Sequence, residues 1–230
     1  MRLDELGGVK LKGRQKSRSF LSILTILMLM AIMGACSHNK ESNAEGKHRA
    51  KVYMEGSFSI NMDDPRATVG DADYVFLARV DKKGKTVYKN KVQIETENGT
   101  KEIATPYTNY KVTVLKNIKG SLQTDQSIPV QKAGGIDKKG DSIVIFEDDA
   151  LPEVGKTYVF LAYAQDDGSL LISGPHSNTL VANIDRTVTS QTVNAYAKQS
   201  DVVSYYEKAF DHQITTDRKR SISKYDTSAN

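Results

Sequence analysis

The eight-residue segment Thr157 to Ala164 (TYVFLAYA) restricts the fold of this chain more than any other segment. A strand with one face in water alternates apolar and polar residues, but this segment is apolar on both faces and must be covered on both sides. The one stretch with clear helical spacing of apolar residues is Thr189 to Phe210, and we expect residues 189–214 to pack as a helix over one face. Ser200-Asp201 should interrupt that helix, since both residues favour the N-cap position.

Several other segments have the pattern of strands. Apolar and polar residues alternate in Tyr107 to Leu115, which predicts one buried face and one wet face. Asn98-Gly99 favours a tight hairpin turn after the strand pattern of residues 91–96. Further strands are predicted at Tyr74–Val80, Ser127–Gln131, Ser142–Phe146 and Leu170–Ile172, with a turn at residues 81–84. The pattern predicts a mainly β fold, a small closed or half-closed barrel over residues 52–188 with the C-terminal helix packed on it.

Residues 1–35 have the pattern of a signal peptide. Six basic residues precede the apolar run Phe20 to Ala35, whose 16 residues are shorter as a helix than the hydrocarbon core of a membrane. Met33-Gly34-Ala35-Cys36 resembles the bacterial lipobox, with methionine where leucine is usual. The resemblance implies cleavage before Cys36, a lipid on its sulfur and a location on the extracellular side of the cell membrane. An uncleaved signal anchor and an incidental free thiol are the alternatives.

The two polar segments that flank the barrel should be flexible. Residues 36–51 contain no large apolar side chain and are predicted to form a tether, since such a segment cannot bury enough surface to offset its ordering entropy. Residues 215–230 form a similarly polar tail, which we expect to be frayed.

Three segments, in this order along the chain, carry a resemblance to a known fold: Ala72–Val80, Tyr110–Gly120 and Leu151–Leu161, the last closed by Asp167–Ile172. They resemble the OB-like barrel of the netrin-module and metalloproteinase-inhibitor superfamily, and also surface proteins of Gram-positive bacteria. The resemblance implies an OB-like barrel. It does not extend to protease inhibition, because those inhibitors chelate zinc through a disulfide-locked N-terminal cysteine, whereas Cys36 lies more than thirty residues before the first of these segments.

Charge and motifs exclude several function classes. The net charge of +4 comes entirely from residues 1–35, and the rest of the chain has 26 basic and 26 acidic residues, which argues against a nucleic-acid partner. No zinc-protease, nucleophile-elbow or phosphate-loop motif is present. The acidic runs at residues 63–64 and 147–149 lack the alternate spacing of a calcium loop, so neither a metal site nor a cofactor is predicted.

The favoured function is a lipid-anchored binding module for a protein, a peptide or an envelope polymer. Tyr107 and Tyr163 have the opposite parity to their buried neighbours and are candidate ligand contacts, and Gly134-Gly135 permits close approach of a ligand or of a neighbouring strand. His176, in a Gly/Pro loop, is a further candidate. The alternative is a cell-envelope hydrolase that uses His176 with loop carboxylates such as Asp148.

Overall fold

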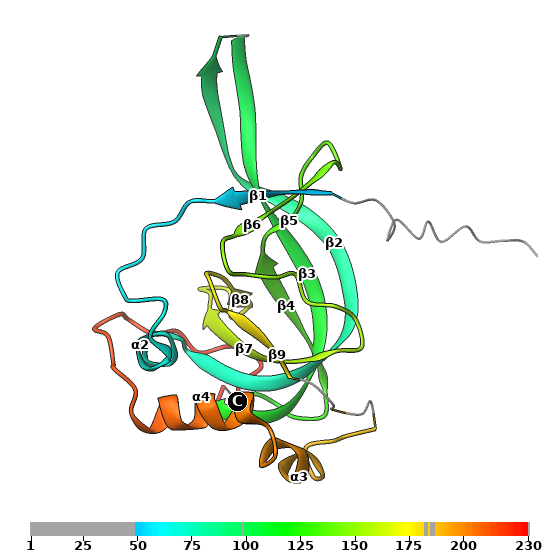
Figure 1. Ribbon diagram of the computed structural model, residues 1–230, viewed down its shortest axis with the longest axis vertical. Coiled ribbons are helices and arrows are strands. Elements are labelled where there is room, and N and C mark those ends of the chain that lie inside the picture. Colours follow the sequence, from blue (N-terminus) through cyan, green and yellow to red (C-terminus); the bar gives the residue numbers. More distant parts are fainter. Residues whose placement is uncertain (1–48, 98, 182–183, 185–186, 230) are drawn as a thin grey trace, which may run out of the picture. The chain divides into compact units, whose positions relative to one another are not determined.

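The computed structural model describes residues 49–229 apart from residues 98, 182–183 and 185–186 (Figure 1). The predicted signal peptide, Cys36 and all but the end of the predicted tether lie outside the described residues. Within the described part, no helix combines the length and the apolar character needed to span a membrane. Strand β1 (Ala50–Met54) includes the last two residues of the predicted tether.

Six strands form a sheet that curves into a ring. They are β2 (Tyr74–Thr96), β3 (Gly99–Lys119), β4 (Ser127–Ala133), β7 (Thr157–Ala164), β8 (Leu170–Ile172) and β9 (Asn178–Val181). Their order is β2-β3-β4-β8-β7-β9, and a further pairing of β2 with β7 brings the sheet back on itself (Figure 1). A second, three-stranded sheet has the order β1-β6-β5, with β5 at Gly135–Ile136 and β6 at Ser142–Phe146. The predicted mainly β class is confirmed.

Strand β7 separates two hydrophobic clusters, as its sequence predicts. Tyr158, Phe160 and Ala162 pack inside the ring, where Phe160 lies 5.7 Å from Phe76 between ring centroids. Val159 and Leu161 point the other way, into a cluster with residues of the helix α4 (Asp201–Asp211). The helical segment is divided as predicted: α3 (Val193–Ala197) ends before Ser200, whose side chain caps α4 by accepting from the Val203 amide. The C-terminal helix is therefore the cover that β7 requires.

The predicted turn at residues 81–84 is wrong, because β2 runs without interruption from Tyr74 to Thr96. Its pairing with β3 shifts between Val80 and Lys82 and again between Lys83 and Thr86. Such irregularities bend a strand and increase its twist, which lets polar and glycine residues remain in the sheet. Turn-type residues here mark a bend in a long strand and not its end. The predicted hairpin is confirmed, but Gly99, which was predicted in the turn, is the first residue of β3 and pairs with Thr96.

The expectation of a frayed tail is also wrong. The tail passes beside the short helix α2 (Pro65–Asp71), which the sequence analysis did not predict. Arg218 and Arg220 donate to backbone oxygens at the end of α2 and to the carboxylate of Asp73, with Arg218 Nη2 at 2.6 Å from Asp73 Oδ1. The Ser223 amide donates to the Tyr74 hydroxyl at 2.9 Å, and Ser223 is fully buried. The tail is ordered because its polar residues form hydrogen bonds and ion pairs with polar groups of the body.

Lys119, beside the helix α2, makes the stability of the protein depend on pH. Its Nζ donates to the backbone oxygens of Val69 and Gly70 at 2.7 and 3.0 Å. Burial lowers the pKa of Lys119 from 10.5 to about 8, and the neighbouring charge of Arg220 acts in the same direction. The unfolded chain therefore holds more protons at this site than the folded chain does between about pH 8 and pH 10.5.

We expect the free energy of unfolding to rise relative to a Lys119→Met variant as the pH increases from 8 to 10. The burial cost of the charge is fully present below pH 8 and is relieved as the folded protein loses the proton. The slope has an upper bound of about 1.4 kcal/mol per pH unit, reduced by solvent screening because the side chain is only half-buried. Urea unfolding of both proteins across this range measures the difference, and parallel pH profiles would contradict the assignment.

Candidate functional site

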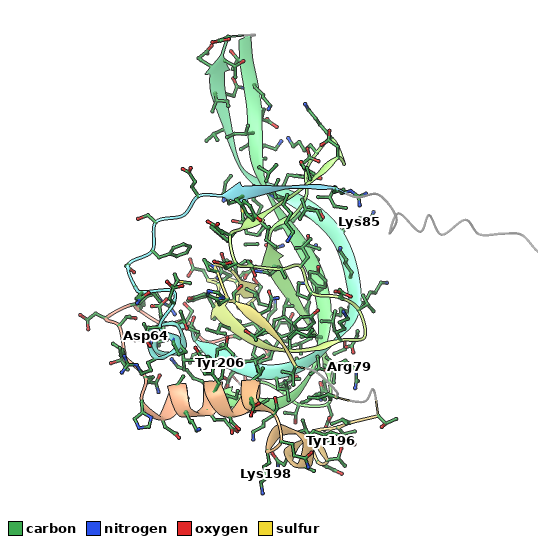
Figure 2. The ribbon with its side chains drawn as sticks, in the orientation of Figure 1. Asp64, Arg79, Lys85, Tyr196, Lys198 and Tyr206 are labelled. Atoms are coloured by element: carbon green, nitrogen blue, oxygen red, sulfur yellow. The ribbon has the colours of Figure 1, made fainter. Side chains whose placement is uncertain are left out.

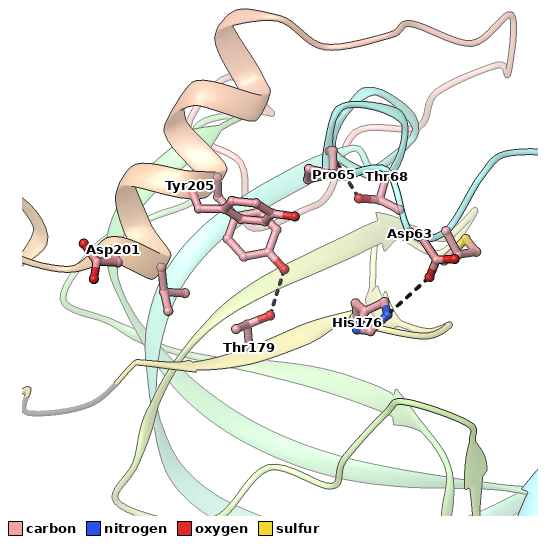
Figure 3. Close-up of a pocket in the computed structure, with 10 residues that line it drawn as sticks. Asp63, Pro65, Thr68, His176, Thr179, Asp201 and Tyr205 are labelled. Atoms are coloured by element: carbon pink, nitrogen blue, oxygen red, sulfur yellow. Dashed lines mark hydrogen bonds and ion pairs between the residues drawn. The ribbon is translucent and has the colours of Figure 1, made fainter.

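A groove of about 520 Å³ lies between α2, α4 and the segment that leads into β9 (Figure 3). Its lining combines apolar and aromatic side chains with a small number of polar groups, a composition typical of ligand sites. The apolar part includes Met62, Pro65, Val202 and Tyr205, and the polar part includes Asp63, His176, Thr179 and Asp201. No Lys or Arg is among the residues that line the groove in the described part of the chain.

The wall formed by α2 is fixed by a helix cap. Asp64 occupies the N-cap position and accepts from the Arg66 amide at 2.9 Å, and Pro65 follows at the first helical position, where a missing amide has no cost. The side chain of Arg66 also pairs with Asp64, which lowers the pKa of that carboxyl group. This arrangement leaves the preceding residue, Asp63, outside the cap, with its side chain 88% exposed at the mouth of the groove.

The opposite wall presents two consecutive tyrosines of α4. Tyr206 is buried and its hydroxyl lies 2.7 Å from Thr179 Oγ1 on β9; burial raises its pKa. Tyr205 is 51% exposed and packs edge-on against Tyr206, with ring centroids 5.3 Å apart (Figure 3). Asp201, in the first turn of the same helix, adds a second carboxylate to the lining. The buried tyrosine thus fixes the position of an exposed aromatic ring.

His176 lies at the third side of the groove. It has φ of +54°, and its Nε2 is 3.7 Å from Asp63 Oδ1. Its side chain is 46% exposed. Its backbone amide donates to the backbone oxygen of Asp148 at 3.3 Å, so the two loops are neighbours, but the carboxylate that meets the imidazole belongs to Asp63. Sequence reasoning found the histidine and missed this partner, which is distant in the chain.

The other predicted contact residues lie away from this groove. Tyr107 is half-buried and its hydroxyl accepts from Asn90 on the neighbouring strand. Tyr163 is half-buried, like Tyr107: the guanidinium of Arg218 lies 5.2 Å from its ring centroid, burial raises the pKa of its hydroxyl, and the residue still lines a small hollow with Phe58. Parity placed Tyr163 on the outer face of the strand, where Arg218 of the tail covers part of its ring.

The absence of side chains at Gly134 and Gly135 lets neighbouring strands approach closely. Gly134 has φ of +110°, and a Cβ atom there would lie 3.0 Å from the backbone oxygen of Val144 on β6. A Cβ atom at Gly135 would lie 2.5 Å from Thr108 Oγ1 on β3. The sequence left open a ligand, a neighbouring strand or turn geometry alone as the reason for this pair. The structure favours contact between strands, together with the positive φ of Gly134.

A buried polar cluster beneath the His176 loop was not found by sequence reasoning. Nζ of Lys132 on β4 contacts Asp149 Oδ2 and lies 2.8 Å from Ser177 Oγ. The side chains of Lys132 and Asp149 are both fully buried. A signal was present, because Lys132 continues the inward-facing alternation of Ile128 and Val130 on a strand whose other face is wetter.

The described residues contain no group of three or more His, Cys, Asp or Glu side chains placed to hold a metal ion. Comparison with models of protein families and with curated proteins finds no match to this chain. The function must therefore be argued from the groove itself.

Proposed function

We propose that this chain is a lipid-anchored extracytoplasmic binding module whose groove binds an extended peptide segment with an apolar side chain next to a basic one. The anchor at Cys36 rests on the sequence pattern of the first 36 residues. The observation that carries the binding role is the exposed ring of Tyr205, held against buried Tyr206, in a groove whose lining also includes the carboxylates of Asp63 and Asp201.

The residues that line the groove complement both the apolar and the basic side chain of the proposed peptide. Aromatic rings fixed in place contribute strongly to binding because they bury a large area with little loss of side-chain entropy. Tyr205, with Met62 and Pro65, offers that apolar surface. The carboxylates, with no Lys or Arg among the described lining residues, complement a Lys or Arg of the ligand.

Binding of short fluorescent peptides tests this role. We expect a peptide with Leu or Phe next to Lys to bind, and Tyr205→Ala to weaken its binding about 30-fold, the effect typical of a central aromatic contact. Tyr196→Ala is the matched control, because Tyr196 is a comparably exposed tyrosine on α3, outside the groove (Figure 2). Replacing the peptide's Lys by Glu should abolish binding, and equal affinity for both peptides would contradict the charge assignment.

An envelope hydrolase is the alternative function, favoured by the proximity of His176 and Asp63. A hydrolase of this kind needs a nucleophile or an activated water beside the imidazole. The two threonines of the lining are engaged elsewhere, Thr68 with the backbone oxygen of Pro65 and Thr179 with Tyr206. Turnover of ester or peptidoglycan substrates that is lost in His176→Ala would overturn the binding role.

A further inference from the structure

The buried pair of Lys132 and Asp149 joins two parts of the fold that are not neighbours in sequence. Lys132 lies on the inner side of β4, where it pairs with Thr108 of β3 and Ile172 of β8. Asp149 lies three residues after the end of β6. A link between the two side chains would therefore join the ring sheet to the segment that follows the second sheet.

The contacts orient both groups for reaction with each other. The Ala150 amide donates to Asp149 Oδ1 at 2.9 Å, which leaves Oδ2 in contact with Lys132 Nζ. Ser177 Oγ lies 2.8 Å from the same nitrogen. An amine and a carboxyl group held in this way have a very high effective concentration, because no translational freedom remains to be lost.

Burial also favours the reactive forms of both groups. Removal from water lowers the pKa of the Lys132 amine and raises that of the Asp149 carboxyl group, in each case as the largest effect. Two buried charges are costly even when they are paired, so the neutral amine and the neutral acid are stabilised relative to the ion pair. A neutral amine is a nucleophile, and a neutral carboxylic acid can lose its hydroxyl group as water.

We propose that Lys132 and Asp149 form an intramolecular amide bond. Nζ of Lys132 attacks Cγ of Asp149, a C–N bond forms, and the bond from Cγ to Oδ2 breaks. One proton from the nitrogen passes through the Ser177 hydroxyl to the departing oxygen, so that one water molecule leaves. No oxidation or reduction takes place. Oδ1 becomes the amide oxygen and keeps its hydrogen bond from the Ala150 amide, which also stabilises the negative charge that develops on it during attack.

The mass of the purified full-length protein tests the bond without any mutation. We expect the protein to be lighter by one water molecule than the mass calculated for its processed and lipid-bearing chain, and Lys132→Met and Asp149→Ala variants, compared in the same way, to show no such loss. Trypsin should fail to cleave after Lys132, and a single product should contain the segments around residues 132 and 149. A folded parent protein with the full mass and normal cleavage at Lys132 would overturn the proposal.

The role of Ser177 has its own test. Ser177→Ala should lower the cross-linked fraction at least tenfold in freshly made protein, while Ser173→Ala, in the same loop, should leave it unchanged. Complete cross-linking of the Ser177→Ala protein would overturn the proton relay but not the bond.

Discussion

Removal of residues 215–230 is expected to lower the free energy of unfolding by about 5 kcal/mol or more, which is comparable with the whole stability of many domains. The reason is the buried carboxylate of Asp73, 3% exposed, which Arg218 and Arg220 neutralise. A buried charge that loses its partner costs about 3 to 5 kcal/mol. The truncated chain would also lose the buried hydrogen bond between Ser223 and Tyr74.

Urea unfolding of the truncated and complete chains measures this loss. Lys219→Ala is the control, since Lys219 lies between the two arginines but is exposed and should change the stability little. Asp73→Asn isolates the charge, because it leaves the size of the side chain nearly unchanged. If the truncated chain unfolds at the same urea concentration as the complete one, the tail does not stabilise the body.

The second large effect is expected from Gly70→Ala, which should destabilise the protein by about 3 kcal/mol. A Cβ atom at this position in α2 would lie 1.8 Å from the backbone oxygen of Ile214 and 2.6 Å from its carbonyl carbon. Backbone atoms cannot rotate away as a side chain can, so the segment after α4 must move. The gain of about 1 kcal/mol that alanine usually brings to a helix is too small to offset this.

Thermal unfolding checks the Gly70 prediction. Arg66→Ala in the same helix is the comparison, because it removes only an exposed ion pair with Asp64, of a kind that adds little to stability. A Gly70→Ala protein as stable as the parent would show that the Ile214 segment can move away without cost.

The sequence predicted those elements in which the spacing of apolar residues shows which faces of the element are buried. The bounds of β7 and β8 were predicted correctly, because a doubly apolar strand and the turn before Leu170 are local signals. The helix α2 was missed although Asp64-Pro65 is a typical helix start, because its buried residues have no helical apolar period and are covered by the tail. The contact of Arg218 with the ring of Tyr163 could not be deduced from strand parity, because Arg218 lies in the tail, far away in the sequence.

The groove could be predicted only in part. His176 was identified by its loop, and the helix predicted over residues 189–214 contains Tyr206, which is buried. Tyr205 was not singled out, because its exposure depends on how α4 rotates onto β7 and β9. The pairing of His176 with Asp63 joins residues more than a hundred positions apart, and no local pattern encodes such contacts.

The attachment of the tail to α2 has a consequence for how the protein is made. Ribosomes release the chain from its first residue to its last, so Asp73 and Tyr74 emerge long before Arg218, Arg220 and Ser223. Until then the early segment carries a carboxylate and a hydroxyl whose final partners do not yet exist. The body therefore cannot reach its finished state until residues 218–223 are free to fold against it.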